Sequence, residues 1–158
     1  IEILKTRPVS NWQIVLGKFW ASLLLVLVAL IPTLTYVYTI YRLGNPIGDM
    51  YVGSIIGSYI GLLFLAATYT AVGLFTSTLS KNQIIAFILG VFITFLLFYG
   101  FDAISNSFSN QSIFIQKFGI NEHFKSISRG VVDSRDLLYF ISATLFFLYI
   151  TKNRLENE

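Results

Sequence analysis

Long stretches without a charged residue alternate with short polar segments along this chain. No Asp, Glu, Lys or Arg occurs from Phe19 to Tyr41, from Met50 to Ser80, or from Asn82 to Phe101. Each stretch reaches the roughly 20 apolar residues that cross ~30 Å of hydrocarbon as an α-helix. One such run is compatible with a buried helix of a soluble protein, but three in succession favour a polytopic membrane protein.

A fourth apolar run, from Leu137 to Thr151, is shorter than the others. A helix that begins at Asp133 and ends near Lys152 would still be long enough to span the bilayer. The pattern therefore predicts an all-α fold with a single transmembrane domain over residues 1–158. Its membrane helices are expected at 12–41, 52–77, 82–101 and 133–152, with an outer segment at 102–132.

Composition and charge agree with a membrane location. The chain is 12% charged and 55% hydrophobic, whereas a soluble domain carries about 25% charged residues. The net charge of +3 is too small to indicate a nucleic-acid partner, so membrane lipid is the expected surrounding. Basic residues at the chain start, at Lys81 and in the tail fall on one side of the predicted membrane. The positive-inside rule places that side in the cytoplasm.

Two predicted helices begin with the same local chemistry. Ser10 and Gln13 have the spacing of a capping box, and Ser80 and Gln83 repeat that spacing. Pro32 lies inside the first predicted span, where it removes a backbone donor and should bend the helix.

Small residues form a stripe along the second predicted span at Gly53, Gly57 and Gly61. Four-residue spacing of small side chains lets helix backbones approach closely in lipid. The stripe therefore predicts a helix-packing face. A face that lines a substrate pathway is the alternative.

The outer segment contains one further periodic pattern. Apolar residues recur there at helical spacing, at Ile120, Phe124, Ile127 and Val131. They predict a short amphipathic helix that lies at the outer interface and ends near Gly130. Asp133 is then expected to cap the last span, with Asp136 favouring its N-terminus.

The chain contains no recognisable catalytic or cofactor-binding constellation. It has one histidine, His123, no cysteine, and no G-x-x-x-x-G-K-[ST] loop for ATP. No charged residue lies deep in the first three predicted spans, which disfavours proton relays, ion-coupled transporters and intramembrane hydrolases. The sequence therefore indicates a non-catalytic protein without a cofactor or metal, such as a permease or channel that receives its energy from elsewhere.

Two stretches carry a resemblance to a known family. "IEILKTRPVSNWQIVLGKF" resembles the cytoplasmic link between the second and third spans of type-2 ABC exporter permeases. "INEHFKSISRGVVDSRDLLYF" resembles the outer segment before the last span in gliding-motility permeases of the GldF type. The residues of this outer motif that match the pattern are His123, Phe124, Arg129, Gly130, Asp133 and Asp136.

The resemblance implies a role and a set of partners. It implies a permease subunit of the bacterial inner (plasma) membrane that pairs with an ABC ATPase subunit and with a second permease, the same or a related one. ATP hydrolysis would reside in the ATPase. Residues 1–11 would be the coupling segment, with contacts from Glu2, Leu4, Lys5, Thr6, Arg7, Pro8 and Val9.

Members of the resembled family have six spans, so the four predicted here are expected to be the third to sixth. A scaffold subunit of a membrane machine, or an ATP-independent transporter or channel, is the alternative function.

Overall fold

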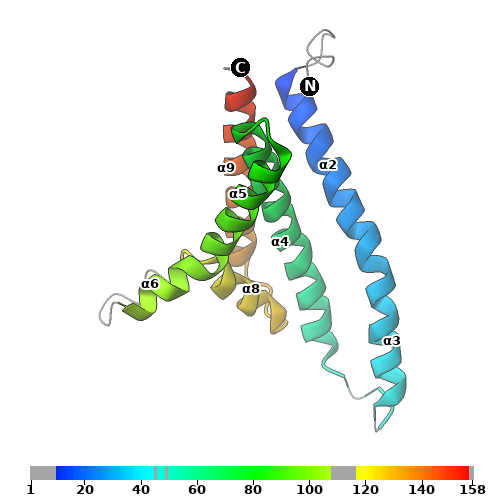
Figure 1. Cartoon of the computed structure of the whole chain (residues 1–158). Coiled ribbons are helices and arrows are strands. Elements are labelled where there is room, and N and C mark those ends of the chain that lie inside the picture. Colours follow the sequence, from blue (N-terminus) through cyan, green and yellow to red (C-terminus); the bar gives the residue numbers. More distant parts are fainter. Residues whose placement is uncertain (1–9, 45, 49, 108–116, 157–158) are drawn as a thin grey trace.

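A computed structural model describes residues 10–44, 46–48, 50–107 and 117–156 of the chain. Every regular element among these residues is a helix (Figure 1). The elements in chain order are α2 (Asn11–Leu30), the 3₁₀ turn η1 (Ile31–Thr33), α3 (Leu34–Leu43), α4 (Val52–Leu79), α5 (Gln83–Phe95), the π-helical segment η2 (Leu96–Gly100), α6 (Phe101–Ser107), α8 (Ile120–Ser128) and α9 (Ser134–Glu156).

The long helices run between two ends of the molecule. α2 begins and α9 ends at one end, called the near end here, where the link between α4 and α5 also lies (Figure 1). α3 ends and α8 lies toward the opposite, far end (Figure 1). The chain therefore turns back three times along its length.

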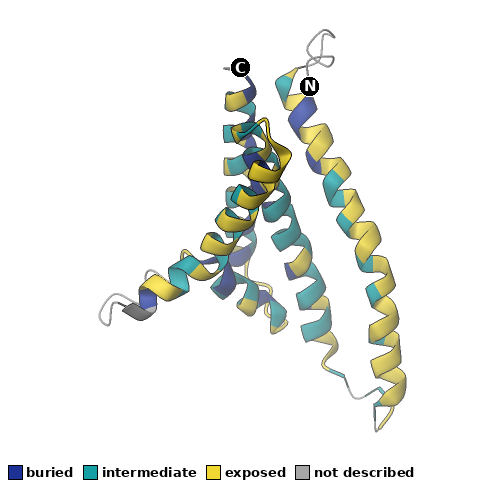
Figure 2. Cartoon of the chain, in the orientation of Figure 1, coloured by how far each residue is buried: buried dark blue, intermediate teal, exposed yellow. Residues whose placement is uncertain are grey.

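Three helical stretches are long and apolar enough to cross a membrane: Asn11–Leu43, Val52–Leu79 and Gln83–Ser105. Most large apolar side chains of α2, α3 and α5 face outward, as the yellow ribbon of Figure 2 shows. A contiguous apolar surface of this kind is favourable in lipid and unfavourable in water. α9 is not among the three stretches, because its ends carry charged residues.

The two predicted capping boxes have different outcomes. At Ser10 the box is confirmed: the Gln13 N–H donates to Ser10 Oγ (3.3 Å), and the Ser10 N–H donates to Gln13 Oε1 (3.0 Å). The second box is wrong, because Asn82 caps α5 by accepting from the Ile84 N–H at 2.9 Å. Asn caps helices as well as Ser does, and Asn82 stands directly before the first helical residue.

The predicted bend at Pro32 takes the form of the 3₁₀ turn η1, which separates α2 from α3. Beyond this turn, α3 and the first turns of α4 lie apart (Figure 1). No residue of α3 is buried. The Thr33 and Tyr59 hydroxyls, 2.8 Å apart, connect the turn to α4.

The third long stretch changes its helical winding before it ends. α5 passes into five π-helical residues and then into α6, so the helix continues past the predicted end at Phe101. π-helical segments bend helices and occur frequently at functional sites. In this protein, the segment directs α6 toward the left of Figure 1 and leads directly to Asp102 in its first turn.

α4 and α9 pack along one another and form the centre of the molecule. Their contact includes a buried hydrogen bond between the Thr68 and Thr144 hydroxyls (3.1 Å) and a ring contact between Phe64 and Phe140 (centroids 6.3 Å apart). Buried apolar clusters lie at both ends of this helix pair. α2 joins the pair at the near end, and α8 joins it toward the far end.

Candidate functional site

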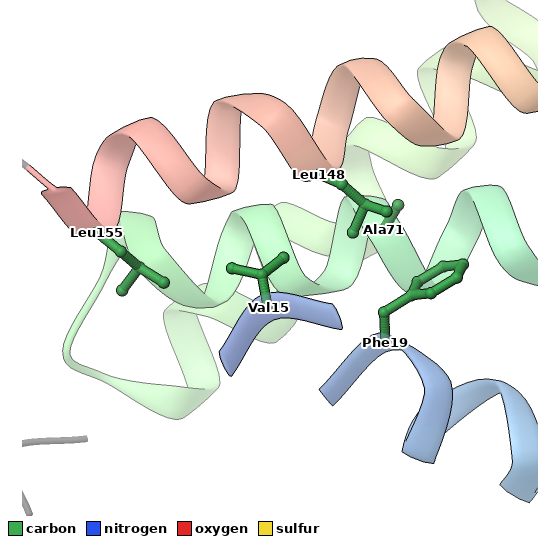
Figure 3. Packing of buried hydrophobic residues seen from close by; sticks show 5 residues of the cluster. All are labelled: Val15, Phe19, Ala71, Leu148 and Leu155. Carbon is green, nitrogen blue, oxygen red and sulfur yellow. The ribbon is translucent and has the colours of Figure 1, made fainter. Parts of the chain in front are cut away.

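Five buried side chains from three helices meet at the near end. Val15 and Phe19 of α2, Ala71 of α4, and Leu148 and Leu155 of α9 point toward one another (Figure 3). We refer to these residues as the near cluster. Ala71 is completely buried. Because Val15 follows the cap at Ser10 by little more than one helical turn, the start of α2 is packed against both α4 and α9.

At the other end of the α4–α9 pair, α8 is held to α9 through His123. His123 Nδ1 lies 2.6 Å from Asp136 Oδ1, and Nε2 lies 2.8 Å from the Lys117 carbonyl oxygen. The carbonyl oxygen can only accept, so Nε2 is the donor of that hydrogen bond. The ring also stacks on Tyr139 (centroids 4.1 Å apart), whose hydroxyl donates to the Phe118 carbonyl at 2.6 Å.

α8 is held to α6 through a second, partly buried polar contact. Asn121 Nδ2 donates to Asp102 Oδ2 at 2.5 Å. Asp102 Oδ1 and Asp136 Oδ2 are buried and have no hydrogen-bond partner within the described part of the chain. One oxygen of each carboxylate therefore contacts a side chain of α8, and the other oxygen is buried away from water. Such groups are costly to bury without a partner.

α8 is held to α4 where its last turn meets the small-residue stripe. Ser54 Oγ donates to the Ser128 carbonyl at 2.7 Å, and Ser58 Oγ lies 3.4 Å from the same oxygen. A Cβ atom on Gly57 would overlap the Ile127 carbonyl oxygen and lie 2.9 Å from Gly130 Cα. A Cβ on Gly61 would lie 3.2 Å from the Phe124 ring. The two backbones approach this closely because Gly57 has no side chain.

Gly130 turns the chain away from α8 at this contact. Its φ of +88° lies in the left-handed region, which a glycine adopts without strain. A Cβ there would also lie 2.9 Å from the Gly53 carbonyl carbon. The stripe at Gly53, Gly57 and Gly61 therefore receives α8 and the turn that follows it.

We call the contacts of α8 with α4, α6 and α9 the far clasp, comprising Ser54, Ser58, Asp102, Asn121, His123, Ser128 and Asp136. Within the far clasp, α8 lies in a different position from the one predicted for the amphipathic helix. Ile120 and Ile127 are buried within the protein instead of facing the lipid interface. Val131, predicted on the same face, is 64% exposed, because the turn at Gly130 ends the helical spacing.

A family comparison identifies what kind of protein carries these two sites. A model of the ABC-2 family transporter proteins matches residues 1–151. The chain belongs to the ABC-2 transporter family. Curated proteins and solved structures gave no match to it.

The protein is therefore a multi-pass membrane permease of an ABC-type transporter. Permeases of this family normally work with an ATPase partner, and the permease itself is the membrane component. The family match covers the far clasp and all of the near cluster except Leu155, which lies beyond residue 151.

In the folded permease, most residues of the predicted outer motif lie close together. His123 and Asp136 pair directly, Phe124 packs against Gly61, and Gly130 forms the turn against Gly53. Asp133 Oδ1 accepts from the Arg135 N–H at 3.1 Å, the position of a cap for α9. Arg129 ends α8 with its backbone N–H bonded to the Ser126 carbonyl, and its side chain is exposed.

The predicted coupling segment Glu2–Val9 lies outside the described residues. Sequence reasoning missed Asp102, Asn121, Ser54 and Ser58 as parts of the site. Asp102 could have been found, because a carboxylate directly after an apolar span is costly unless it has a partner. Within the described ranges, no group of three or more His, Cys, Asp or Glu side chains is close enough to hold a metal ion.

Proposed function

We propose that this permease couples ATP hydrolysis by a separate cytoplasmic ATPase subunit to export across the bacterial inner membrane, with residues Glu2–Val9 as the segment that contacts the ATPase. The near cluster is the observation that supports the proposal most strongly. α2 starts at a closed capping box and packs within its first turns on both α4 and α9. A movement of the segment before Ser10 would therefore displace α2 as a rigid body against the helix pair.

The packing of α4 on α9 gives such a movement a route to the far end. The same two helices contact α2 at the near cluster and α8 at the far clasp. Between these contacts they are joined by the Thr68–Thr144 hydrogen bond and by aromatic packing. In this mechanism a shift of α4 relative to α9 changes how α8 is held and opens or closes the outer side of the pathway.

The membrane orientation follows from charge. Lys81 lies in the link between α4 and α5, and Lys152 and Arg154 lie in the last turns of α9, all at the near end. With the basic chain start, these residues support a cytoplasmic near end under the positive-inside rule. The ATPase is then on the side of the membrane where ATP is available.

Further features of the proposal rest on the resemblance stated for the two sequence stretches. The permease would work with a second permease subunit, identical or related, and the resemblance of its outer motif to that of gliding-motility permeases supports a role in gliding motility. α9 would be a fourth span, with its charged first turn at the outer surface. A scaffold subunit that docks the ATPase but moves no cargo is the second candidate, since membership in a family does not by itself establish transport.

Co-purification tests the proposed ATPase contact. The full-length permease is expressed with a candidate cytoplasmic ABC ATPase subunit, and the pair is purified through a tag on the permease. Leu4→Asp and Arg7→Asp should each reduce recovery of the ATPase several-fold. Leu4→Asp introduces a negative charge into the contact, and Arg7→Asp reverses a positive one. Arg135→Asp, the matched change at the exposed start of α9, should leave recovery unchanged. If all three variants recover the ATPase equally well, the proposed contact is refuted.

A further inference from the structure

An apolar groove lies between α3 and α4, away from both the near cluster and the far clasp. Its volume is about 620 Å³, within the ~300–1,000 Å³ range of small-molecule sites. Four residues of α3 form one wall at helical spacing: Leu34, Val37, Tyr38 and Tyr41. The first turns of α4, including Ile56 and Tyr59, form the other wall.

The groove begins just beyond the 3₁₀ turn at Pro32, where α3 and the first turns of α4 lie apart (Figure 1). One end of it is closed where Thr33 and Tyr59 share a hydrogen bond of 2.8 Å, so these hydroxyls satisfy each other. The remaining lining is almost entirely aliphatic and aromatic carbon. An apolar space of this kind does not retain water, because water needs two to four polar partners.

The length of the groove matches one leaflet of a bilayer. α3 has 10 residues, which at 1.5 Å per residue extend about 15 Å. The hydrocarbon core is about 30 Å thick, so α3 extends across roughly half of it. The two walls of the groove belong to Asn11–Leu43 and Val52–Leu79, two of the three stretches that are apolar enough to cross the membrane.

A cation lies beside Tyr38, one of the residues that line this groove. Arg42 lies in the last turn of α3, where its Nε donates to the Tyr38 hydroxyl at 3.0 Å and its guanidinium carbon lies 5.5 Å from the Tyr38 ring centroid. Among the described residues, no carboxylate lies within ion-pair distance of Arg42. The guanidinium therefore keeps N–H groups that can donate to a phosphate, the anion whose geometry Arg matches best.

We propose that the groove binds one acyl chain of a phospholipid from the far-end leaflet, with the lipid phosphate against Arg42. Hydrocarbon fills the space between α3 and α4, and the phosphate accepts from the Arg42 guanidinium. This site is independent of the proposed ATPase coupling, because it requires neither ATP nor the coupling segment.

Photolabelling tests the acyl chain. The full-length permease with its ATPase is reconstituted, without ATP, in phosphatidylethanolamine vesicles that contain phosphatidylglycerol with a photoreactive group on the acyl chain. Mass spectrometry then locates the labelled peptides. We expect labelling of the α3 and α4 residues of the groove. Ile56→Trp, which fills the groove from α4, and Val37→Trp, which fills it from α3, should each reduce labelling there several-fold.

Ile84→Trp is the matched control, since Ile84 is 69% exposed on α5 and Ile56 is 56% exposed on α4. It should leave labelling of the groove unchanged. Unchanged labelling in Ile56→Trp and Val37→Trp would overturn the proposal. If a helix of a partner subunit cross-links to the groove residues and keeps lipid out of the groove, the proposal is overturned as well.

A second probe tests the phosphate contact. Arg42→Gln should reduce groove labelling by photoreactive phosphatidylglycerol several-fold but leave labelling by the matching diacylglycerol, which has no phosphate, unchanged. Arg135→Gln, at another exposed arginine outside the groove, should affect neither probe. Equal effects of Arg42→Gln on both lipids would show that Arg42 does not bind the phosphate and would overturn that part of the proposal.

Discussion

His123 Nδ1 on α8 and Asp136 Oδ1 on α9 lie 2.6 Å apart, and Asp136 is only 6% exposed. This pair joins two helices that are separated in the sequence by a glycine turn. Because the second carboxylate oxygen has no partner in the described part of the chain, Asp136 depends on His123 for its main stabilising contact. The pair therefore determines how firmly α8 is docked.

Removing either partner should loosen α8. His123→Ala or Asp136→Asn breaks a hydrogen bond to a charged group, worth about 1.5–3 kcal/mol. We expect hydrogen exchange of the α8 amides to accelerate about 10- to 100-fold, since exchange follows the free energy of local opening. The double variant should exchange little faster than the more affected single variant, because both changes remove the same contact.

Lys125→Ala is the control for this pair. Lys125 also lies on α8, but its contact with Glu122 is 3.8 Å long and exposed. Such surface pairs contribute about 0.2–1 kcal/mol at most, so the exchange of α8 should change little. An equal effect of Lys125→Ala and His123→Ala would show that the pair with Asp136 has no special role.

The close approach of α4 and α8 predicts opposite results for two glycines of one helix. Gly57→Ala places a methyl group against the Ile127 carbonyl and Gly130 Cα, both of them backbone atoms. It should destabilise the permease by about 1–3 kcal/mol, as overpacking does. Gly73→Ala meets nothing within 4 Å and should stabilise the helix slightly, by up to about 1 kcal/mol.

Thermal unfolding of the purified permease in detergent, followed by the loss of monodisperse protein, compares the two glycine variants. Gly57→Ala should unfold at a lower temperature than the wild type, and Gly73→Ala at the same or a higher temperature. If Gly57→Ala is as stable as Gly73→Ala, α8 does not dock on the small-residue stripe.

The hydroxyl pair at the middle of the α4–α9 contact should have a small effect. Thr68 and Thr144 can also donate to the Phe64 and Phe140 carbonyls within their own helices, so three contacts share two hydroxyl protons. A double-mutant cycle with Thr68→Val and Thr144→Val should give a coupling energy of about 0.6 kcal/mol, typical of hydrogen bonds between membrane helices. A coupling near zero would mean that the two helices are held by packing alone.

The membrane helices could be predicted from sequence because their signal is local. A charge-free run such as Met50 to Ser80 needs no partner to be recognised as a span. The cap at Ser10 was predicted correctly for the same reason, since Gln13 is its only nearby partner. At Ser80 the same rule failed because Asn82, another good cap, stands closer to the helix.

The far clasp could be predicted only in part, because it depends on contacts between distant segments. The spacing of Ile120, Phe124 and Ile127 indicated a helix, and the helix is present. Its position against α4 is determined by Ser54 and Ser58, which bind the carbonyl of Ser128, more than 65 residues away in the sequence. Local periodicity carries no information about such a pairing.

In the proposed mechanism, the near cluster transmits movement from the ATPase contact to the α4–α9 pair. Ala71→Leu tests it most directly, because Ala71 is completely buried between α2 and α9 and a larger side chain forces α2 away. Ala29→Leu, on the exposed face of α2, is the matched control. The measurement is ATP hydrolysis by the purified complex in vesicles, with ATPase recovery recorded in parallel.

We predict that Ala71→Leu retains the ATPase in normal amount but loses the effect of the permease on its rate of ATP hydrolysis, while Ala29→Leu retains both. Protected α8 amides in both variants would show that the far end remains folded. Wild-type coupled hydrolysis in the Ala71→Leu complex would contradict the account.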